Sequence, residues 1–242
     1  MNDILVDLQA LTIEREGRRV VDALTLSVGR GEVYALVGGN GAGKTTTLGA
    51  LLGFMRPAGG SARVAGFSPV DDEAAVKRRV AFLPENVALY PYLSGIENLQ
   101  YFCALGGRDV DKRLAGQLLT EVGLQPDWHA QPTARYSKGM RQKVGLAIAH
   151  AREAQVMLLD EPTSGLDPAA ANELAMRVLE AADRGMAVLM ATHDLPNVRR
   201  VADRVGVLRQ GRLVAEFNVA GLTADTLEQA YLAHGASGSE ES

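Results

Sequence analysis

The residues with the clearest chemical signature lie between Gly38 and Thr45 and read Gly-Gly-Asn-Gly-Ala-Gly-Lys-Thr. This spacing has the G-x-x-x-x-G-K-[ST] form of a phosphate-binding loop. Its glycines let successive backbone N–H groups point inward at an anion, and the following helix adds the positive end of its dipole. Lys44 can reach the β- and γ-phosphates, and the Thr45 hydroxyl is placed to ligate Mg²⁺. The alternative is a glycine-rich turn with no ligand, which would leave the Lys44 charge unpaired.

Two acidic residues, Asp160 and Glu161, follow an apolar run at 156–159 that is typical of a strand buried on both faces. Ligands of open α/β sheets bind at the carboxyl ends of the strands, so both carboxylates are expected at the edge that holds the phosphate-binding loop. Asp160 is expected to anchor Mg²⁺, and Glu161 to orient and polarise an attacking water. The alternative is an acidic pair at a helix N-terminus. Pro162 and the late start of the next helix, near Pro168, argue against it.

His193 directly follows the strand predicted at 187–192, so it emerges at the same carboxyl edge. Its imidazole could hydrogen-bond the γ-phosphate of a bound nucleotide. The alternative for such a residue is a structural histidine with no part in the chemistry.

The phosphate-binding loop requires a strand before it and a helix after it. An unbroken apolar run at 33–37 predicts the strand, and apolar residues at helical spacing predict a helix that continues to about Met55, before Pro57. Strands and helices alternate again from residue 156, which predicts a parallel sheet. Alternating residues at 4–28 predict antiparallel strands at the start of the chain.

The middle of the chain is helical in pattern, and Ser94 and Glu97 form a capping box at its first helix. The expected fold is therefore α/β, with a P-loop NTPase core, a mainly parallel sheet, an N-terminal antiparallel β-subdomain and an inserted helical subdomain at about 86–153. One domain is expected over residues 1–235, followed by a flexible tail at 236–242.

The composition suits a cytoplasmic protein. Of 242 residues, 47% are hydrophobic, yet the apolar runs are far shorter than the roughly 20 residues needed to cross a bilayer. The first residues lack the pattern of a signal peptide. The single cysteine, Cys103, excludes an internal disulfide and a cysteine-based metal cluster. A net charge of −4 argues against a broad nucleic-acid-binding face.

Several motifs, in their order along nearly the whole chain, make the sequence resemble the ATP-binding subunit of an ATP-binding cassette (ABC) transporter. Tyr136-Ser137-Lys138-Gly139-Met140 resembles the family's signature motif, and Asp160-Glu161 resembles its Walker B pair. Ser164-Gly165-Leu166-Asp167 resembles the D-loop, and His193 the switch histidine. Leu-Pro-Glu at 83–85 and Tyr-Ser-Lys-Gly-Met-Arg-Gln at 136–142 are similar to the branch that drives exporters with separately encoded permeases.

The resemblance implies an ATPase that uses ATP and Mg²⁺ and works as a head-to-tail homodimer, in which Ser137 and Gly139 of one subunit cap the nucleotide held by Lys44 of the other. It also implies integral membrane permease subunits as partners and a location on the inner face of the cell membrane; no nucleic acid is expected. The alternative is a soluble ABC-type ATPase that acts on DNA or ribosomes. The implied ATP-binding residues are Gly38, Asn40, Gly41, Ala42, Gly43, Lys44, Thr45, Thr46, Ser137, Gly139 and Asp167.

Some positions depart from the family's pattern. Glu85 stands where the family usually has a glutamine that senses Mg²⁺ and the attacking water, so Glu85 is expected to act in catalysis and at the metal, with a stronger dependence on the metal. Lys138 replaces a glycine of the usual signature motif. No aromatic residue is found near Arg15 or Glu16 to stack on adenine, so Arg15, through a cation–π contact, or Val20 could contact the base.

The segment from Glu85 to Leu105 is the expected contact surface for the membrane partner. It starts at the strand edge where the γ-phosphate is sensed, and its first part is unusually apolar for a loop. The alternative is that these residues fold back onto the helical block as core. They are Val87, Ala88, Leu89, Tyr90, Pro91, Tyr92 and Leu93.

Overall fold

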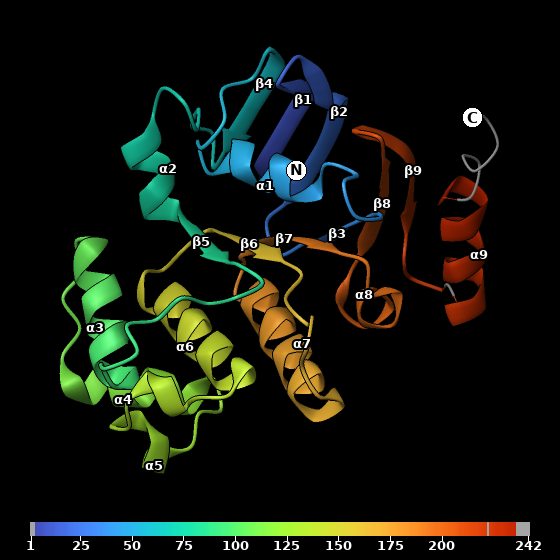
Figure 1. Ribbon diagram of the computed structural model, residues 1–242. Helices are drawn as coiled ribbons and strands as arrows, with labels where there is room; N and C mark the ends of the chain where they lie inside the picture. Colours follow the sequence, from blue (N-terminus) through green and yellow to red (C-terminus); the bar gives the residue numbers. More distant parts are fainter. Residues whose placement is uncertain (1–2, 222, 236–242) are drawn as a thin grey trace.

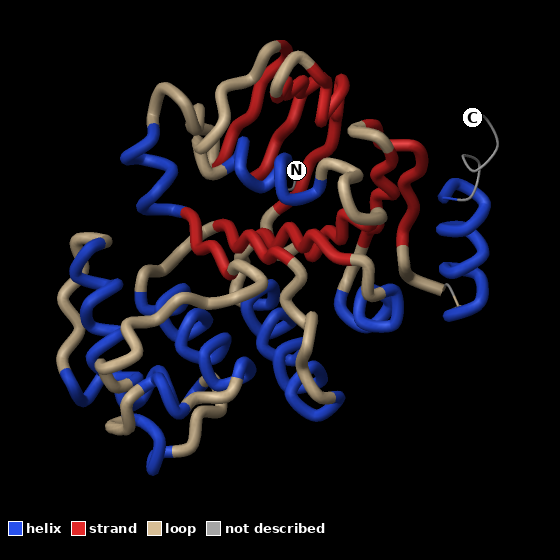
Figure 2. The backbone as a smooth tube through the Cα atoms, in the orientation of Figure 1, coloured by secondary structure: helices blue, strands red, loops and turns tan. Residues whose placement is uncertain are grey.

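The computed structural model describes residues 3–221 and 223–235, which form two sheets with helices around them (Figure 1, Figure 2). The smaller sheet is antiparallel, with the order β2-β1-β4. It is the N-terminal β-subdomain that the alternating residues predicted. Its strands are β1 (Ile4–Arg15), β2 (Arg18–Gly29) and β4 (Gly59–Val64).

The larger sheet has the order β5-β6-β7-β3-β8-β9 and is parallel except for β9, which pairs antiparallel with β8. The predicted, mainly parallel sheet is therefore confirmed. Its strands are β3 (Val33–Val37), β5 (Val80–Leu83), β6 (Val156–Asp160), β7 (Ala187–Thr192), β8 (Arg204–Arg209) and β9 (Arg212–Asn218).

Strand β3 shows why an unbroken apolar run precedes the phosphate-binding loop. All five of its side chains are buried. Val33, Ala35 and Val37 lie in the core shared with the helical block, whereas Tyr34 and Leu36 lie in the core shared with the smaller sheet. Because both faces of the strand are covered, the polar alternation of a half-exposed strand is lost.

Helices cover both faces of the larger sheet (Figure 1). Helix α1 (Lys44–Leu51) lies between the two sheets, and α7 (Pro168–Asp183) and α8 (Leu195–Val201) lie on the other face. Helix α9 (Ala224–Gly235) packs against α8. The predicted tail at 236–242 lies outside the described residues. No helix in the described part of the chain is long and apolar enough to span a membrane.

The helical block lies beyond β5, at one end of the larger sheet (Figure 1). The predicted capping box is present: the Ser94 hydroxyl accepts the Glu97 N–H at 3.2 Å, and the Glu97 carboxylate accepts the Ser94 N–H at 2.7 Å. Two N–H groups at the helix start are thereby satisfied. The block contains α3 (Gly95–Leu105), α4 (Lys112–Glu121), α5 (Pro126–His129), the 3₁₀ turn η1 (Thr133–Arg135) and α6 (Lys138–Ala151).

Three helices differ from the sequence-based expectation. Helix α1 ends at Leu51, about one turn before Met55, because Gly53 has a φ of +78° and lies so close to Pro69 that a side chain would meet its carbonyl oxygen at 2.6 Å. Helices α2 (Glu73–Arg79) and α8 were not predicted. Both are short, and α2 buries only Val76, so it carries no apolar periodicity.

His150, on α6, gives an expected pH dependence of stability. Neither of its ring nitrogens has a hydrogen-bond partner among the described residues. Burial, reinforced by the nearby guanidinium of Arg184, lowers the pKa of His150 below its usual 6.5. As the pH falls through 6.5, the histidine of the unfolded chain takes up a proton while that of the folded chain stays neutral. The free energy of unfolding therefore decreases. We expect the melting temperature to fall more between about pH 7.5 and 5.5 in the wild type than in His150→Leu; equal decreases would contradict this.

Candidate functional site

The phosphate-binding loop leaves β3 and enters α1 at Lys44, as predicted. Gly43 has a φ of +108°, and a Cβ atom there would lie 2.7 Å from the Val20 carbonyl oxygen, so the loop needs glycine at this point. The loop opens into a hollow of about 260 Å³. The hollow is lined by Val20, Gly39, Asn40, Gly41, Ala42, Gly43, Lys44, Thr45, Thr46, Glu85, Asp160 and Glu161.

The ammonium group of Lys44 is buried and paired within the chain. Its Nζ donates to the carbonyl oxygens of Gly38 at 2.6 Å and Gly39 at 3.3 Å, and lies 3.3 Å from Oε1 of Glu161. The argument that Lys44 would be an uncompensated charge in a turn without a ligand is therefore wrong, because Glu161, from outside the loop, pairs with it. Strand β7 lies between β3, which leads into the loop with Lys44, and β6, which ends directly before Glu161, yet the two side chains meet at the carboxyl edge of the sheet.

Glu161 is the residue on which the predicted site residues converge. Its Oε2 lies 2.9 Å from Nδ1 of His193 and accepts a hydrogen bond from the Thr192 hydroxyl at 3.1 Å. Burial opposes the charge of this carboxyl, but the His193 hydrogen bond and the Lys44 charge outweigh it, so the pKa of Glu161 lies below its usual value. Glu161 is therefore a carboxylate at neutral pH. Its φ of +44° lies in the left-handed region, which costs such a residue about 1 kcal/mol or more.

Asp160 and Thr45 form a small oxygen-rich group beside Glu161. The Thr45 hydroxyl donates to Oδ1 of Asp160 at 3.2 Å. Burial raises the pKa of Asp160, an effect that the Thr45 hydrogen bond partly offsets. A hydroxyl and a carboxylate are ligands that Mg²⁺ prefers. The pair fits an ion such as Mg²⁺, which keeps several waters and takes further ligands from phosphates.

Glu85 enters the same hollow from the segment after β5. Its Oε1 accepts a hydrogen bond from the Ser164 hydroxyl at 2.9 Å and lies 3.8 Å from Nζ of Lys138. The sequence singled out Glu85 but not the role of Ser164, Lys138 or Thr192 as contacts of the acidic groups. For Thr192 a signal existed, because it directly precedes His193 at the end of β7.

Four of the predicted ATP-binding residues do not line the hollow: Gly38, which contacts Lys44 through its carbonyl oxygen, and Ser137, Gly139 and Asp167, which lie apart from it. The Ser137 hydroxyl accepts the Met140 N–H at 3.2 Å and caps α6, and Asp167 caps α7 in the same way. Gly139 faces α7, where a Cβ atom would lie 3.4 Å from Cβ of Ala170. Of the two candidates for contact with a base, Val20 lines the hollow and Arg15 does not.

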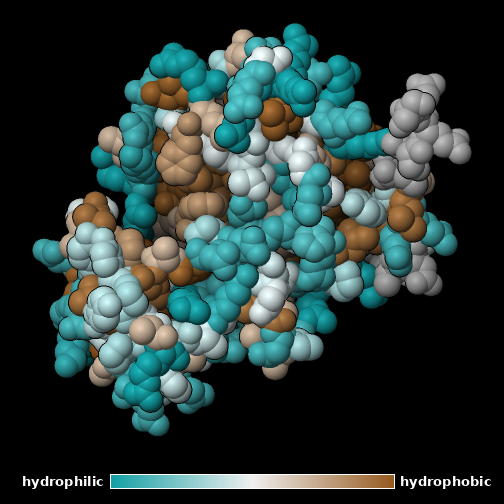
Figure 3. Space-filling view, in the orientation of Figure 1, coloured by the Kyte–Doolittle hydropathy of each residue, from teal (hydrophilic) through white to brown (hydrophobic). Residues whose placement is uncertain are grey.

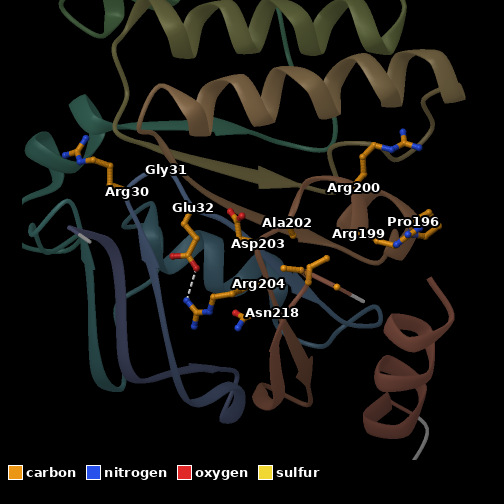
Figure 4. A pocket seen from close by; sticks show the side chains of 13 residues that line it. Arg30, Gly31, Glu32, Pro196, Arg199, Arg200, Ala202, Asp203, Arg204 and Asn218 are labelled. Atoms are coloured by element: carbon orange, nitrogen blue, oxygen red, sulfur yellow. Dashed lines mark hydrogen bonds and ion pairs between the residues drawn. The ribbon is translucent and has the colours of Figure 1, made fainter. Parts of the chain in front are cut away.

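A larger hollow, of about 1010 Å³, lies at the opposite, amino edge of the sheet (Figure 4). Three of its charged groups take part in contacts that stabilise the fold: Arg204 pairs with Glu32 at 2.8 Å, and Asp203 accepts the Val33 N–H at 2.8 Å. These contacts hold the amino ends of β3 and β8 together. Size alone therefore does not mark the site of the chemistry, which the phosphate-binding loop places at the carboxyl edge.

Comparison with known proteins identifies the family of the chain. A family model described as ABC transporter matches residues 21–164, more than half of the chain. An uncharacterised ABC transporter ATP-binding protein of Bacillus subtilis, YhcH, is 35% identical over 216 residues, which are 89% of this chain and 70% of that protein. The bacitracin transport ATP-binding protein BcrA of Enterococcus faecalis is 32% identical over 221 residues, which are 91% of this chain and 71% of that protein.

A solved structure described as the ATP-binding subunit of an ABC transporter superposes with a TM-score of 0.83 and 31% identity, and covers 94% of this chain and 99% of that chain. The two structures therefore share one fold over nearly the whole chain. The chain thus belongs to the ABC transporter family, as an ATP-binding subunit that hydrolyses ATP to power transport.

Proposed function

We propose that this subunit powers an exporter as a head-to-tail homodimer, attached to separately encoded permease subunits at the inner face of the cell membrane. The assignment of ATP hydrolysis to this site is supported by the position of Glu161 beside the phosphate-binding loop. Its carboxylate lies 3.3 Å from Nζ of Lys44 and 2.9 Å from Nδ1 of His193. The sequence forms at 83–85 and 136–142 and the likeness to a bacitracin transport subunit support the export direction.

When ATP binds, Lys44 gives up its ion pair with Glu161 and pairs with the phosphates instead. The phosphates attract its ammonium group away from Glu161, whose freed carboxylate then accepts a hydrogen bond from a water molecule and orients it. The water oxygen bonds to the γ-phosphorus as the bond to the β–γ bridging oxygen breaks, giving ADP and phosphate. His193 holds Glu161 in place through Nδ1, and its Nε2 donates to the γ-phosphate when the imidazole carries both protons. Thr45 and Asp160, with Glu85 beside them, would hold Mg²⁺, which would supply neutralisation of the charge on the phosphate oxygens.

A second copy of the chain completes the site. Ser137 and Gly139 lie at the start of α6, a helix of 14 residues whose first N–H groups can bind an anion. Asp167 lies at the start of α7. Since none of the three reaches the hollow of its own chain, we infer that they contact the γ-phosphate side of a nucleotide held by the other subunit.

The proposed permease contact is an aromatic surface made of Tyr90, Tyr92 and Tyr101. Tyr92 is 91% exposed, and the hydroxyls of Tyr90 and Tyr101 lie 3.2 Å apart. The expectation that the whole apolar run faces the partner is wrong for Val87 and Leu89, which pack against the core. Apolar side chains also gather in a hollow between α2 and the helical block (Figure 3). A cytoplasmic segment of the permease with apolar side chains fits such a surface.

The aromatic surface can be tested without disturbing the core. Tyr90→Ser with Tyr92→Ser should leave the melting temperature and the ATPase activity of the isolated subunit nearly unchanged, because the backbone groups of Tyr90 keep their bonds to Asn98. Co-purification with the permease from native membranes should fall strongly, since anchors of this type contribute roughly 2 kcal/mol or more each.

The matched control is Met176→Ser, on α7, where the replaced side chain is 53% exposed and lies outside the aromatic surface. It should co-purify at wild-type yield. Wild-type yield for the tyrosine double variant as well would place the docking surface elsewhere, and unfolding of that variant would show that the tyrosines belong to the core.

A further inference from the structure

At the rim of the phosphate hollow, the Glu85 carboxylate contacts side chains from two other segments of the chain, those of Lys138 and Ser164. Glu85 follows β5, Lys138 is the first residue of α6, and Ser164 lies in the loop between β6 and α7. Both contacts of Glu85, with the Ser164 hydroxyl at 2.9 Å and the Lys138 ammonium at 3.8 Å, use the same oxygen, Oε1. The carboxylate is thus held on its outer side by groups that do not themselves line the hollow.

The charges of the hollow show what this arrangement can do. Three carboxylates, those of Glu85, Asp160 and Glu161, line it with the single ammonium of Lys44. A polyanionic nucleotide that enters would be repelled by each carboxylate that lacks a cation. Lys44 neutralises Glu161, and Lys138 is the cation that the structure places beside Glu85. The Lys138 side chain is only 23% exposed, so solvent screens the pair less than a fully exposed one.

Glu85 and Lys138 stand where the family usually has glutamine and glycine, and both belong to the forms at 83–85 and 136–142 that resemble the exporter branch. A neutral pair of residues is thus replaced by two opposite charges that lie together in the fold. The net charge at this corner of the site is unchanged, which a single substitution would not achieve.

We propose that Lys138 is a positioning residue for Glu85: with Ser164, it neutralises the carboxylate and holds it against the rim, so that Mg²⁺ and ATP meet a paired carboxylate. This inference rests on the proposed placement of the nucleotide in the phosphate-binding loop. It predicts that the effect of Lys138 on ATP affinity depends on the charge of Glu85 and becomes larger when Mg²⁺ is removed.

The test is a double-mutant cycle in the full-length subunit, with ATP affinity measured by calorimetry with Mg²⁺ and with EDTA. Lys138→Met should weaken ATP binding about fivefold with Mg²⁺, because a partly exposed ion pair contributes at most about 1 kcal/mol. The loss of affinity should be larger with EDTA. In the Glu85→Gln background the same substitution should change the affinity less than about twofold. Lys138→Arg, which keeps the charge, should retain wild-type affinity.

Lys143→Met is the matched control, because Lys143 lies on the same helix and pairs with Glu173 at 2.8 Å, away from the hollow. It should leave ATP affinity unchanged. An equal penalty for Lys138→Met with and without Glu85→Gln would mean that Lys138 contacts the nucleotide directly and would overturn the proposal, as would no penalty at all. Lys44→Ala separates the two proposals: unchanged ATP affinity in that variant would overturn the nucleotide site itself, and the positioning role with it.

Discussion

Glu161→Gln is expected to cut ATP turnover by on the order of 10²-fold or more while ATP binding stays intact. Glutamine has nearly the same size and can keep a hydrogen bond to Thr192, but it lacks the negative charge that orients and polarises the attacking water. The substitution also releases Lys44 from its ion pair, so the lysine is free for the phosphates. Steady-state turnover tests the predicted loss of hydrolysis, and calorimetric ATP affinity, measured on the same preparation, tests the predicted intact binding.

Lys44→Ala is the necessary comparison, because it removes the other member of the same pair. It should weaken ATP binding, since the loop loses its cation and the Glu161 charge is left facing the phosphates. The two variants therefore divide binding from chemistry. An equal loss of ATP binding in both would refute this division, and full turnover in Glu161→Gln would assign the water to another group.

ATP is expected to convert Glu161→Gln from a monomer into a stable dimer. Without hydrolysis the γ-phosphate remains, and the N-terminus of α6 from a second subunit can bind its outer side. Size-exclusion chromatography should show a dimer with ATP and Mg²⁺, and a monomer with ADP. A dimer of equal stability with either nucleotide would argue against a contact through the γ-phosphate.

Ser137→Arg, added to Glu161→Gln, should abolish the ATP-driven dimer. The arginine replaces the capping hydroxyl and fills the space in front of the first N–H groups of α6. Thr223→Arg is the matched control, because it places the same side chain next to the start of α9, away from the phosphate hollow. A dimer that persists with Ser137→Arg would exclude the composite site.

The elements that carry the motifs could be predicted because each has a local signal. A buried strand, a glycine-rich loop and an apolar-periodic helix mark β3 and α1, and the serine caps mark α3 and α6. Helices α2 and α8 were missed for different reasons. Helix α2 is short and buries only Val76, so it has no apolar periodicity. Helix α8 carries a local signal that was overlooked, because Asp194 caps its first turn and Pro196 follows.

The contacts of the site depend on strand order and could not be predicted from local patterns. The Lys44–Glu161 pair forms only because β6 and β3 both flank β7. Ser164 and Glu85, which share a hydrogen bond, are 79 positions apart in the sequence. The motifs therefore predicted which side chains take part, whereas the partner of each charge follows from the three-dimensional arrangement.

The order of the strands also has a consequence for how the protein is made. Strand β3 has its partners far along the chain, with Val33 opposite Val188 and Tyr34 opposite Arg204. Contacts that close such long loops form slowly, and ribosomes add only about 5–20 residues per second. The phosphate-binding loop is thus synthesised many seconds before the strands that flank it and before Glu161. We therefore expect a growing chain to bind ATP only once nearly all of it has left the ribosome, so that unfinished subunits cannot dimerise around a nucleotide.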